Sequence, residues 1–312
     1  KIPVVYMQNS GLGNCINPLT SLTNKEVYSI PMLLIIGWRG DPEIKDEPQH
    51  ALPGKILNKQ LEIMNIPAYE LDKNSNYKEL ISLSIKTLNK INSPVAILVK
   101  DNSFEKYRDF HQIESSGLFT RKTAIEKIIK KANKSDIFLT TTGKASRELY
   151  QIRIDRKEIP RDFLTVGSMG HVSSIALGLS HGLKESQNII CIDGDGSCLM
   201  HMGSLAILGT SKIKNLKYFL INNGVHDSVG GQDTVGFKVD FCQIAKGCRF
   251  EFIKRCNNVS ELESIIDSDE FKKSSSFVEV VVEVEKSKNL IRPKESPLQN
   301  KEYFINYLRS LE

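Results

Sequence analysis

The chain has 312 residues, of which 40% are hydrophobic and 25% charged, and its formal net charge is +5. This length allows two domains of ordinary size, each able to bury its own core. The apolar runs are too short to span a bilayer, and the lysines and arginines are scattered instead of forming a stripe. We therefore expect neither a membrane protein nor a nucleic-acid-binding protein.

The first hundred residues predict strands that alternate with helices. Short apolar runs indicate strands at 4–7, 31–36, 68–71 and 95–100. Helices are expected at 17–28, 54–64 and 77–91, and a loop at 8–14. Alternation of this kind is typical of a parallel sheet with helices on both faces.

The remaining residues predict a second unit of the same architecture. Residues 101–119 are polar and lack periodicity, so we expect the link between two domains there. Further strands are expected at 137–140, 163–166, 189–192, 218–221, 250–252 and 278–284. Helices are expected at 121–131, 144–150, before 179, at 197–208 and at 301–311. The predicted fold class is α/β, with two doubly wound parallel-sheet domains.

The six cysteines have no Cys-x-x-Cys spacing. Cys191 lies in an apolar strand and Cys198 in the helix that follows, where reduced thiols behave as small hydrophobic groups. This usage predicts free thiols and a cytoplasmic location.

Two polar positions follow neighbouring predicted strands. Asp195 lies between two glycines after the strand 189–192, and Asn223 follows the strand 218–221. Because the carboxyl ends of parallel strands meet at one sheet edge, the carboxylate and the amide would lie there together. Such oxygens suit Mg²⁺, and the glycines and the helix N-terminus suit a diphosphate. The alternative is that Asp195 only caps the following helix.

These residues resemble the thiamin diphosphate signature, in which Gly-Asp-Gly is followed by Asn-Asn; here Asn222 lies 25 residues after Ser197. With Gly-Ser-Met-Gly-His at 167–171 and His-Asp-Ser-Val-Gly-Gly-Gln at 226–232, the chain resembles the phosphonopyruvate decarboxylases along nearly its whole length. The resemblance implies non-oxidative decarboxylation of 3-phosphonopyruvate to phosphonoacetaldehyde and CO₂ via a thiamin diphosphate ylid. It places the reaction in 2-aminoethylphosphonate biosynthesis.

The resemblance also implies the domain roles and the assembly. Residues 1–105 would form a pyrimidine-binding domain, 106–130 a linker and helix, and 131–312 a diphosphate-binding domain with a C-terminal helix. The cofactor of this family lies between domains of two subunits, which implies a homo-oligomer, at least a dimer, with shared active sites.

The cofactor and metal residues follow from the same resemblance. Asp195, Asn223 and the Val225 carbonyl would bind Mg²⁺. Met169 would support the bent cofactor, although it is also compatible with plain core packing. The full set of cofactor-binding positions is Gly167, Ser168, Met169, His171, Gly194, Asp195, Gly196, Ser197, Asn223 and Val225.

The substrate side is assigned to four further residues. Arg39 is the candidate for the phosphonate, because a guanidinium fork suits that group; the alternative is a surface arginine in a turn. His50 and His226 are candidates for proton transfer or anion binding, with a structural role as the alternative. Ser228, with its neighbour Val229, matches positions that face the reactive carbon. The other histidines, at 111, 181 and 201, are taken as structural.

No residue of this sequence matches the glutamate that activates the cofactor in this family. We expect it before Lys1, in a segment of roughly 50–70 residues that would complete a domain of usual size. A chain beginning at Lys1 would then bind the cofactor weakly and would not decarboxylate. Two alternatives stay open: a sulfopyruvate decarboxylase, or a non-catalytic cofactor-binding subunit that lacks this glutamate.

Overall fold

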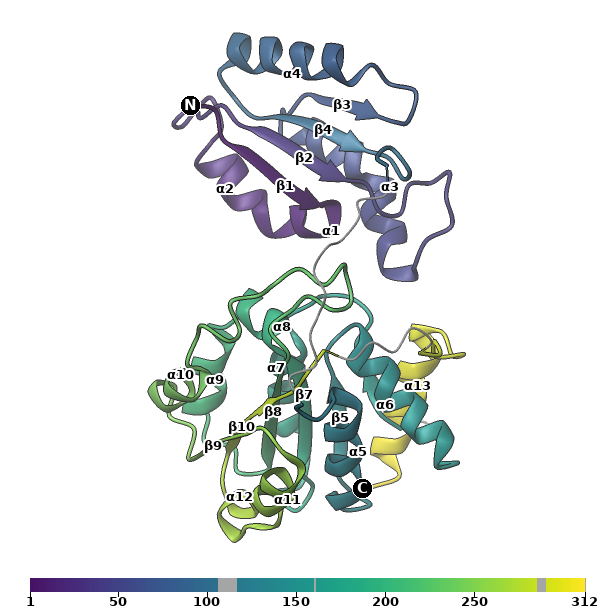
Figure 1. The fold of residues 1–312 in the computed structure, drawn as a ribbon, viewed down its shortest axis with the longest axis vertical. Helices are drawn as coiled ribbons and strands as arrows, with labels where there is room; N and C mark the ends of the chain where they lie inside the picture. Colours follow the sequence, from purple (N-terminus) through teal and green to yellow (C-terminus); the bar gives the residue numbers. More distant parts are fainter. Residues whose placement is uncertain (106–116, 160, 285–289, 312) are drawn as a thin grey trace. The chain divides into compact units, whose positions relative to one another are not determined.

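The computed structural model describes residues 1–105, 117–159, 161–284 and 290–311. The chain divides into two compact units, Lys1–His111 and Gln112–Glu312 (Figure 1). Much of the expected link, and His111 with it, lies outside the described residues. Each unit contains its own parallel sheet with interleaved helices, which confirms the predicted fold class.

The first unit is built on four parallel strands in the order β1-β2-β4-β3. Their bounds are Val4–Gln8 for β1, Leu33–Gly37 for β2, Ala68–Leu71 for β3 and Val95–Val99 for β4. All five residues of β4 are buried, as expected for an inner strand that is covered on both faces. The edge strand β1 instead exposes Val4 and Tyr6.

Alternate residues of these strands pack on opposite faces. One face is covered by α1 (Asn9–Leu12), α2 (Ile16–Ser21) and α3 (Pro48–Ile63), and the other by α4 (Tyr77–Ile91). Leu34 and Ile36 join the cluster with α3, whereas their neighbour Leu33 joins the cluster with α4. The strand period of two therefore produces the two-sided core.

Three local predictions in this unit were wrong. The helix expected at 17–28 ends at Ser21. Residues 9–15 form α1 and a 3-10 turn instead of a loop, because Leu12 is fully buried in the core cluster next to α3. The helix expected from 54 begins at Pro48, since proline is well tolerated in the first turn of a helix.

The second unit is built on six parallel strands in the order β6-β5-β7-β8-β10-β9. Their bounds are Ile137–Thr140 for β5, Phe163–Leu164 for β6, Ile189–Gly194 for β7, Leu216–Asn222 for β8, Phe252–Cys256 for β9 and Ser276–Val281 for β10. The strand β7 pairs with β8 along its whole length, which confirms that the two polar motifs follow neighbouring strands.

Helices cover both faces of this sheet as well. One face carries α5 (Arg121–Lys131), α6 (Lys144–Asp155), α11 (Val259–Asp267) and α12 (Asp269–Lys273). The other carries α7 (Val172–Ser180), α8 (Asp195–Met200), α9 (Ser204–Thr210), α10 (Phe241–Gly247) and α13 (Pro297–Arg309).

The single helix expected at 197–208 is in fact two, α8 and α9. The backbone leaves the helical region at His201, whose φ and ψ are −135° and 43°. Helices α10, α11 and α12 were not predicted, although a side chain caps the N-terminus of each: Asp240, Asn258 and Ser268. These capping residues were the sequence signal from which the three helices could have been predicted.

In the described ranges, no helix combines the length and the apolar composition needed to cross a membrane. The six cysteine thiols are free, and Cys191 and Cys198 are buried as expected.

Candidate active site

The candidate site lies where the strand order of the second sheet reverses. From β5 the chain runs outward to β6 and then returns to β7 on the other side of β5. The loops after β5 and β7 therefore lead to helices on opposite faces, α6 and α8. Such a switch point opens a crevice at the carboxyl ends of the strands, where α/β sheets bind ligands.

Asp195 begins α8 directly after β7, and it is only 2% exposed. The Thr234 hydroxyl donates a hydrogen bond to its Oδ2. Burial raises the pKa of Asp195, although the backbone N–H groups of Gly196 and Asn223 favour its ionised form. Among the residues that the structure describes, no lysine, arginine or histidine pairs with it. A buried carboxylate without a cationic partner fits a metal ion.

The two asparagines after β8 have different surroundings. Asn222 is a structural residue, because its amide donates to the Gly236 carbonyl and to Glu279, each at 2.9 Å. Asn223 is buried, and the one hydrogen bond that its Oδ1 accepts from the described residues is long, at 3.3 Å from the Val225 N–H. Its amide oxygen therefore has capacity left for a further partner.

The third expected donor is the Val225 backbone carbonyl. Val225 forms an antiparallel bridge with Asp233. In the two hydrogen bonds of this bridge, the Gly224 carbonyl accepts and the His226 N–H donates. One carboxylate, one amide oxygen and one carbonyl are hard oxygen donors of the kind that suits Mg²⁺. Within the described residues, no cluster of three or more acidic, histidine or cysteine side chains offers another metal site.

Ser197 connects three of the loops at this edge. Its hydroxyl accepts hydrogen bonds from the Thr141 hydroxyl at 2.8 Å and from the Gly170 N–H at 3.0 Å. The loops after β5, β6 and β7 thus converge on one buried side chain. The sequence interpretation did not include Thr141, although it directly follows a predicted strand.

The loop after β6 turns sharply. Ser168 and Gly170 both have positive φ, at 51° and 93°. A Cβ on Gly170 would lie 2.4 Å from the His201 ring, so only glycine fits there. Gly167 and Met169 are partly buried, and Met169 is not a member of the described core clusters.

The His171 ring packs against His201 in a tilted arrangement, with 4.2 Å between the ring centroids and 52° between the ring planes. His201 was taken as structural from the sequence. The structure instead places it beside the loop that carries the expected cofactor residues. Its Nε2 is buried and has no hydrogen-bond partner in the described part of the chain. No sequence signal distinguished it, because this contact depends on the break between α8 and α9.

The loop after β8 carries His226 and Ser228. The His226 ring packs on the turn after β7: a Cβ on Gly196 would lie 2.7 Å from the ring. The Ser228 hydroxyl accepts a hydrogen bond of 3.0 Å from the Lys144 N–H at the start of α6. The side chain of Val229 is largely exposed.

Arg39 and His50 belong to the first unit, at the carboxyl end of β2 and the start of α3. The Arg39 guanidinium donates to Asp46 through Nε at 2.7 Å and Nη2 at 2.5 Å, which lowers the pKa of that carboxyl strongly. The fork that we assigned to a phosphonate is therefore occupied by a carboxylate in this structure. His50 shares a 3.0 Å hydrogen bond with Ser10, and burial and the Arg39 charge lower its pKa.

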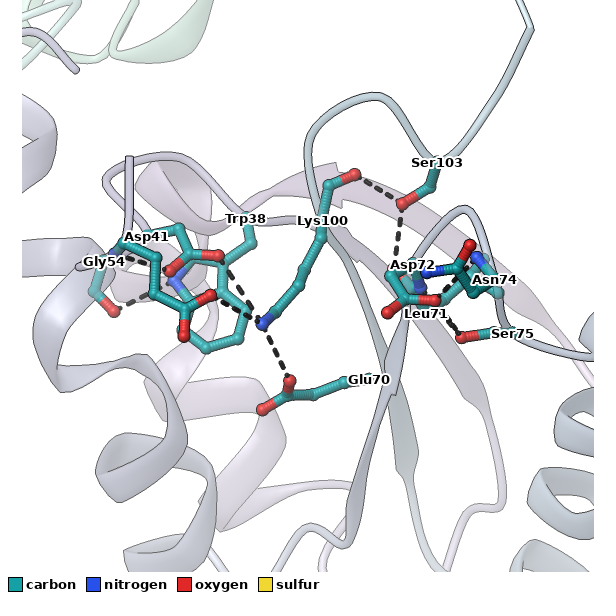
Figure 2. A network of polar contacts seen from close by, with 11 residues as sticks. Trp38, Asp41, Gly54, Glu70, Leu71, Asp72, Asn74, Ser75, Lys100 and Ser103 are labelled. Atoms are coloured by element: carbon teal, nitrogen blue, oxygen red, sulfur yellow. Dashed lines mark hydrogen bonds and ion pairs between the residues drawn. The ribbon is translucent and has the colours of Figure 1, made fainter. Parts of the chain in front are cut away.

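Lys100, at the end of β4, is neutralised in the same way. Its Nζ lies 3.3 Å from Glu70, 3.4 Å from Glu43 and 3.9 Å from Asp41 (Figure 2). The same Nζ lies 5.6 Å from the centre of the Trp38 ring. Both Arg39 and Lys100 thus have acidic partners at this sheet edge.

Several known proteins are similar to this chain in sequence. Residues 141–280 match the model of the thiamine pyrophosphate enzyme, C-terminal TPP binding domain. A phosphonopyruvate decarboxylase of Streptomyces viridochromogenes is 31% identical over 308 residues, which cover 94% of this chain and 76% of that protein. A sulfopyruvate decarboxylase of Methanosarcina acetivorans is 30% identical over 90% of this chain and 76% of that protein. A sulfopyruvate decarboxylase subunit beta of Methanocaldococcus jannaschii is 40% identical over 41% of this chain and 66% of that protein.

Proposed function

Because this chain belongs to the family of thiamin diphosphate-dependent phosphonopyruvate decarboxylases and their sulfopyruvate relatives, we propose that the full-length protein decarboxylates 3-phosphonopyruvate with thiamin diphosphate and Mg²⁺. One observation supports the metal site: the Asp195 carboxylate is buried near Asn223 and has no cationic partner among the described residues. Membership of the family supports the decarboxylation reaction, whereas the preference for a phosphonate substrate is our own proposal.

The residues of the second unit would bind the cofactor. Asp195, Asn223 and the Val225 carbonyl would hold Mg²⁺ against the diphosphate, and the turn from Gly194 to Ser197 would approach that diphosphate closely. When bound, the cofactor accepts the electrons that decarboxylation leaves behind, so the protein supplies orientation and a dry site. Gly167, Ser168, Met169 and His171 would orient the pyrimidine end.

The substrate residues of the proposal come from both units. His226 and Ser228 would face the substrate from the loop after β8. His50 would bind or move a proton through Nε2, because Nδ1 is already bonded to Ser10. Arg39 would bind the phosphonate only by sharing or releasing Asp46, which is a specific requirement on that residue. A cytoplasmic homo-oligomer with shared sites, acting in 2-aminoethylphosphonate biosynthesis, completes the proposal.

The test is release of CO₂ by the full-length protein with Mg²⁺ and thiamin diphosphate. Phosphonopyruvate, sulfopyruvate and pyruvate are compared at equal concentration. We expect the highest kcat/KM with phosphonopyruvate. A preference for sulfopyruvate, which the Methanosarcina relative supports, would replace the substrate assignment. Cofactor binding without CO₂ release from any of the three would indicate the non-catalytic subunit.

A further inference from the structure

Four charged side chains meet where the loop after β8 contacts α5 and α6. Asp227 accepts hydrogen bonds from Lys144 Nζ at 2.5 Å and from Arg121 Nη2 at 3.1 Å. Arg121 is held in turn by the fully buried Glu148, which accepts from its Nε at 2.7 Å and from its Nη2 at 2.8 Å. Two cations and two anions leave this cluster without net charge, as burial demands.

The neighbouring Ser228 makes a second attachment to the same helix. The N-cap residue of α6 is Gly143, which has no side chain to cap the helix. The Ser228 hydroxyl takes that role from another loop by accepting the Lys144 N–H. The Asp227 carboxylate also lies close to the positive end of the α6 dipole. Two consecutive residues therefore dock the loop on the first turn of α6.

His226 precedes these two anchors directly. Its carbonyl accepts the N–H groups of Val229 and Gly231, and its own N–H donates to the Gln232 carbonyl. These main-chain bonds fix the backbone of His226 relative to Asp227. On its other side the ring contacts the Gly196 backbone, so the loop bridges α6 and the turn after β7.

We propose that Asp227 is a positioning residue: through Arg121 and Lys144 it fixes His226 over the turn that carries Asp195. Glu148 acts one step further back, by aligning the Arg121 fork. The significance of this position for decarboxylation rests on the proposed function, whereas the positioning itself does not.

The first measurement is amide hydrogen exchange of the protein without cofactor. In Asp227→Asn we expect the peptide covering 226–232 to exchange roughly 10- to 100-fold faster, the factor that a lost charge-assisted hydrogen bond brings. The matched control is Asp267→Asn. It removes a partner of Lys131 at the same 2.5 Å distance, in a pair that links α5 to α11 instead of the loop. This control should leave the 226–232 peptide unchanged.

A second pair of variants keeps the test valid if Asp227→Asn fails to fold. Lys144 is partly exposed, so its replacement is easier to tolerate. Lys144→Met should accelerate exchange of the same peptide, whereas Lys144→Arg keeps the cation and should retain most of the protection. Slow exchange in both Asp227→Asn and Lys144→Met, or equal acceleration in Asp267→Asn, would overturn the positioning role.

Steady-state kinetics on the full-length enzyme separates the two levels of the proposal. A misplaced His226 should lower kcat by about 10- to 100-fold and change KM much less, since substrate still binds. A fall in kcat with unchanged exchange would mean that Asp227 acts directly, which contradicts positioning. If no 2-oxo acid is decarboxylated at all, the proposed function fails while the exchange experiment still decides the role of Asp227.

Discussion

Asp195 and Arg39 show opposite electrostatic situations at the two sheet edges. Asp195 is a buried carboxylate whose pKa burial raises, and none of the described cations balances it. Arg39 is already paired, and its fork lowers the pKa of Asp46. The first residue therefore has capacity for a cation, whereas the second must give up a partner before it binds an anion.

For Asp195 the expected outcome concerns stability without cofactor. Asp195→Asn removes a buried unpaired charge and should raise the free energy of unfolding at pH 7 by about 1–3 kcal/mol. Mg²⁺ with thiamin diphosphate should then stabilise the wild type but not the variant. Urea unfolding with and without the cofactor measures both effects.

The matched control is Asp193→Asn, two residues earlier, in the strand β7 that precedes Asp195. Asp193 is equally buried, but it is engaged by the Tyr218 hydroxyl at 2.7 Å and by the Gly194 N–H. This variant should retain stabilisation by the cofactor. Loss of stabilisation in Asp193→Asn together with its survival in Asp195→Asn would reverse the metal assignment.

Arg39→Ala should lower kcat/KM for phosphonopyruvate by about one to two decades, with a smaller loss for pyruvate, since a charge-assisted contact is lost only with the former. Asp46→Asn is the control, because it frees the guanidinium without removing it. In this control variant, kcat/KM for phosphonopyruvate divided by kcat/KM for pyruvate should match or exceed the wild-type ratio. Equal losses on both substrates in both variants would show that Arg39 only holds its loop.

Acid unfolding tests the Arg39–Asp46 pair itself. The Asp46 carboxyl has a lower pKa in the folded chain than in the unfolded chain. It therefore stabilises the fold when the pH lies above its ordinary pKa of 3.8. This contribution is lost as the pH falls through the lowered pKa. The difference in unfolding free energy between wild type and Arg39→Ala should therefore shrink as the pH falls below 3.8. A difference that grows in acid would contradict the pairing.

At the scale of elements, the turn from β7 into α8 depends on close contact with the loop after β8. Gly194 and Gly196 flank Asp195 but differ in their surroundings. A Cβ on Gly194 would meet nothing within 4 Å, whereas one on Gly196 would overlap the His226 ring. The second glycine is thus required by packing even before any ligand is considered.

Gly196→Ala should accordingly destabilise the cofactor-free protein by roughly 1–3 kcal/mol, the usual cost of overpacking. Gly194→Ala should change the unfolding free energy by much less. Urea unfolding measures the two variants under identical conditions, and hydrogen exchange of 226–232 reports whether the loop moves. Equal stability of the two variants would mean that His226 moves aside at little cost.

At the scale of the whole molecule, the residues proposed for one site are divided between two units. Arg39 and His50 lie in the first unit, and the cofactor and metal residues lie in the second. In the proposed oligomer a single site takes its residues from two subunits. A defect in one unit would then be complemented by a subunit whose defect lies in the other unit.

We expect full-length subunits carrying Arg39→Ala and Asp195→Ala to recover part of the wild-type activity when they are co-expressed. Each variant alone should be impaired. Co-expression of Asp195→Ala with Asn223→Ala, both in the second unit, is the control and should recover nothing. Decarboxylation assays on the purified mixtures measure the outcome, and equal activity in the two mixtures would contradict shared sites.

Local pattern alone determined much of the fold. The strand at 137–140 and the helices at 77–91 and 121–131 have the bounds that the sequence predicted. The same reasoning brought Asp195 and Asn223 to one sheet edge, because apolar runs before both marked buried parallel strands. Such elements are decided by side-chain periodicity over a few residues, which a sequence displays directly.

The tertiary structure decided the contacts of the charged and polar side chains. The Arg121–Asp227 bond joins residues 106 positions apart, and the helix at 9–12 forms because Leu12 is buried next to α3. Arg39 was identified from its place after a strand, but its partner Asp46 was not. The physical reason is common to these cases: the energy of a charge or a buried leucine depends on which groups surround it, and only the packed chain brings those groups together.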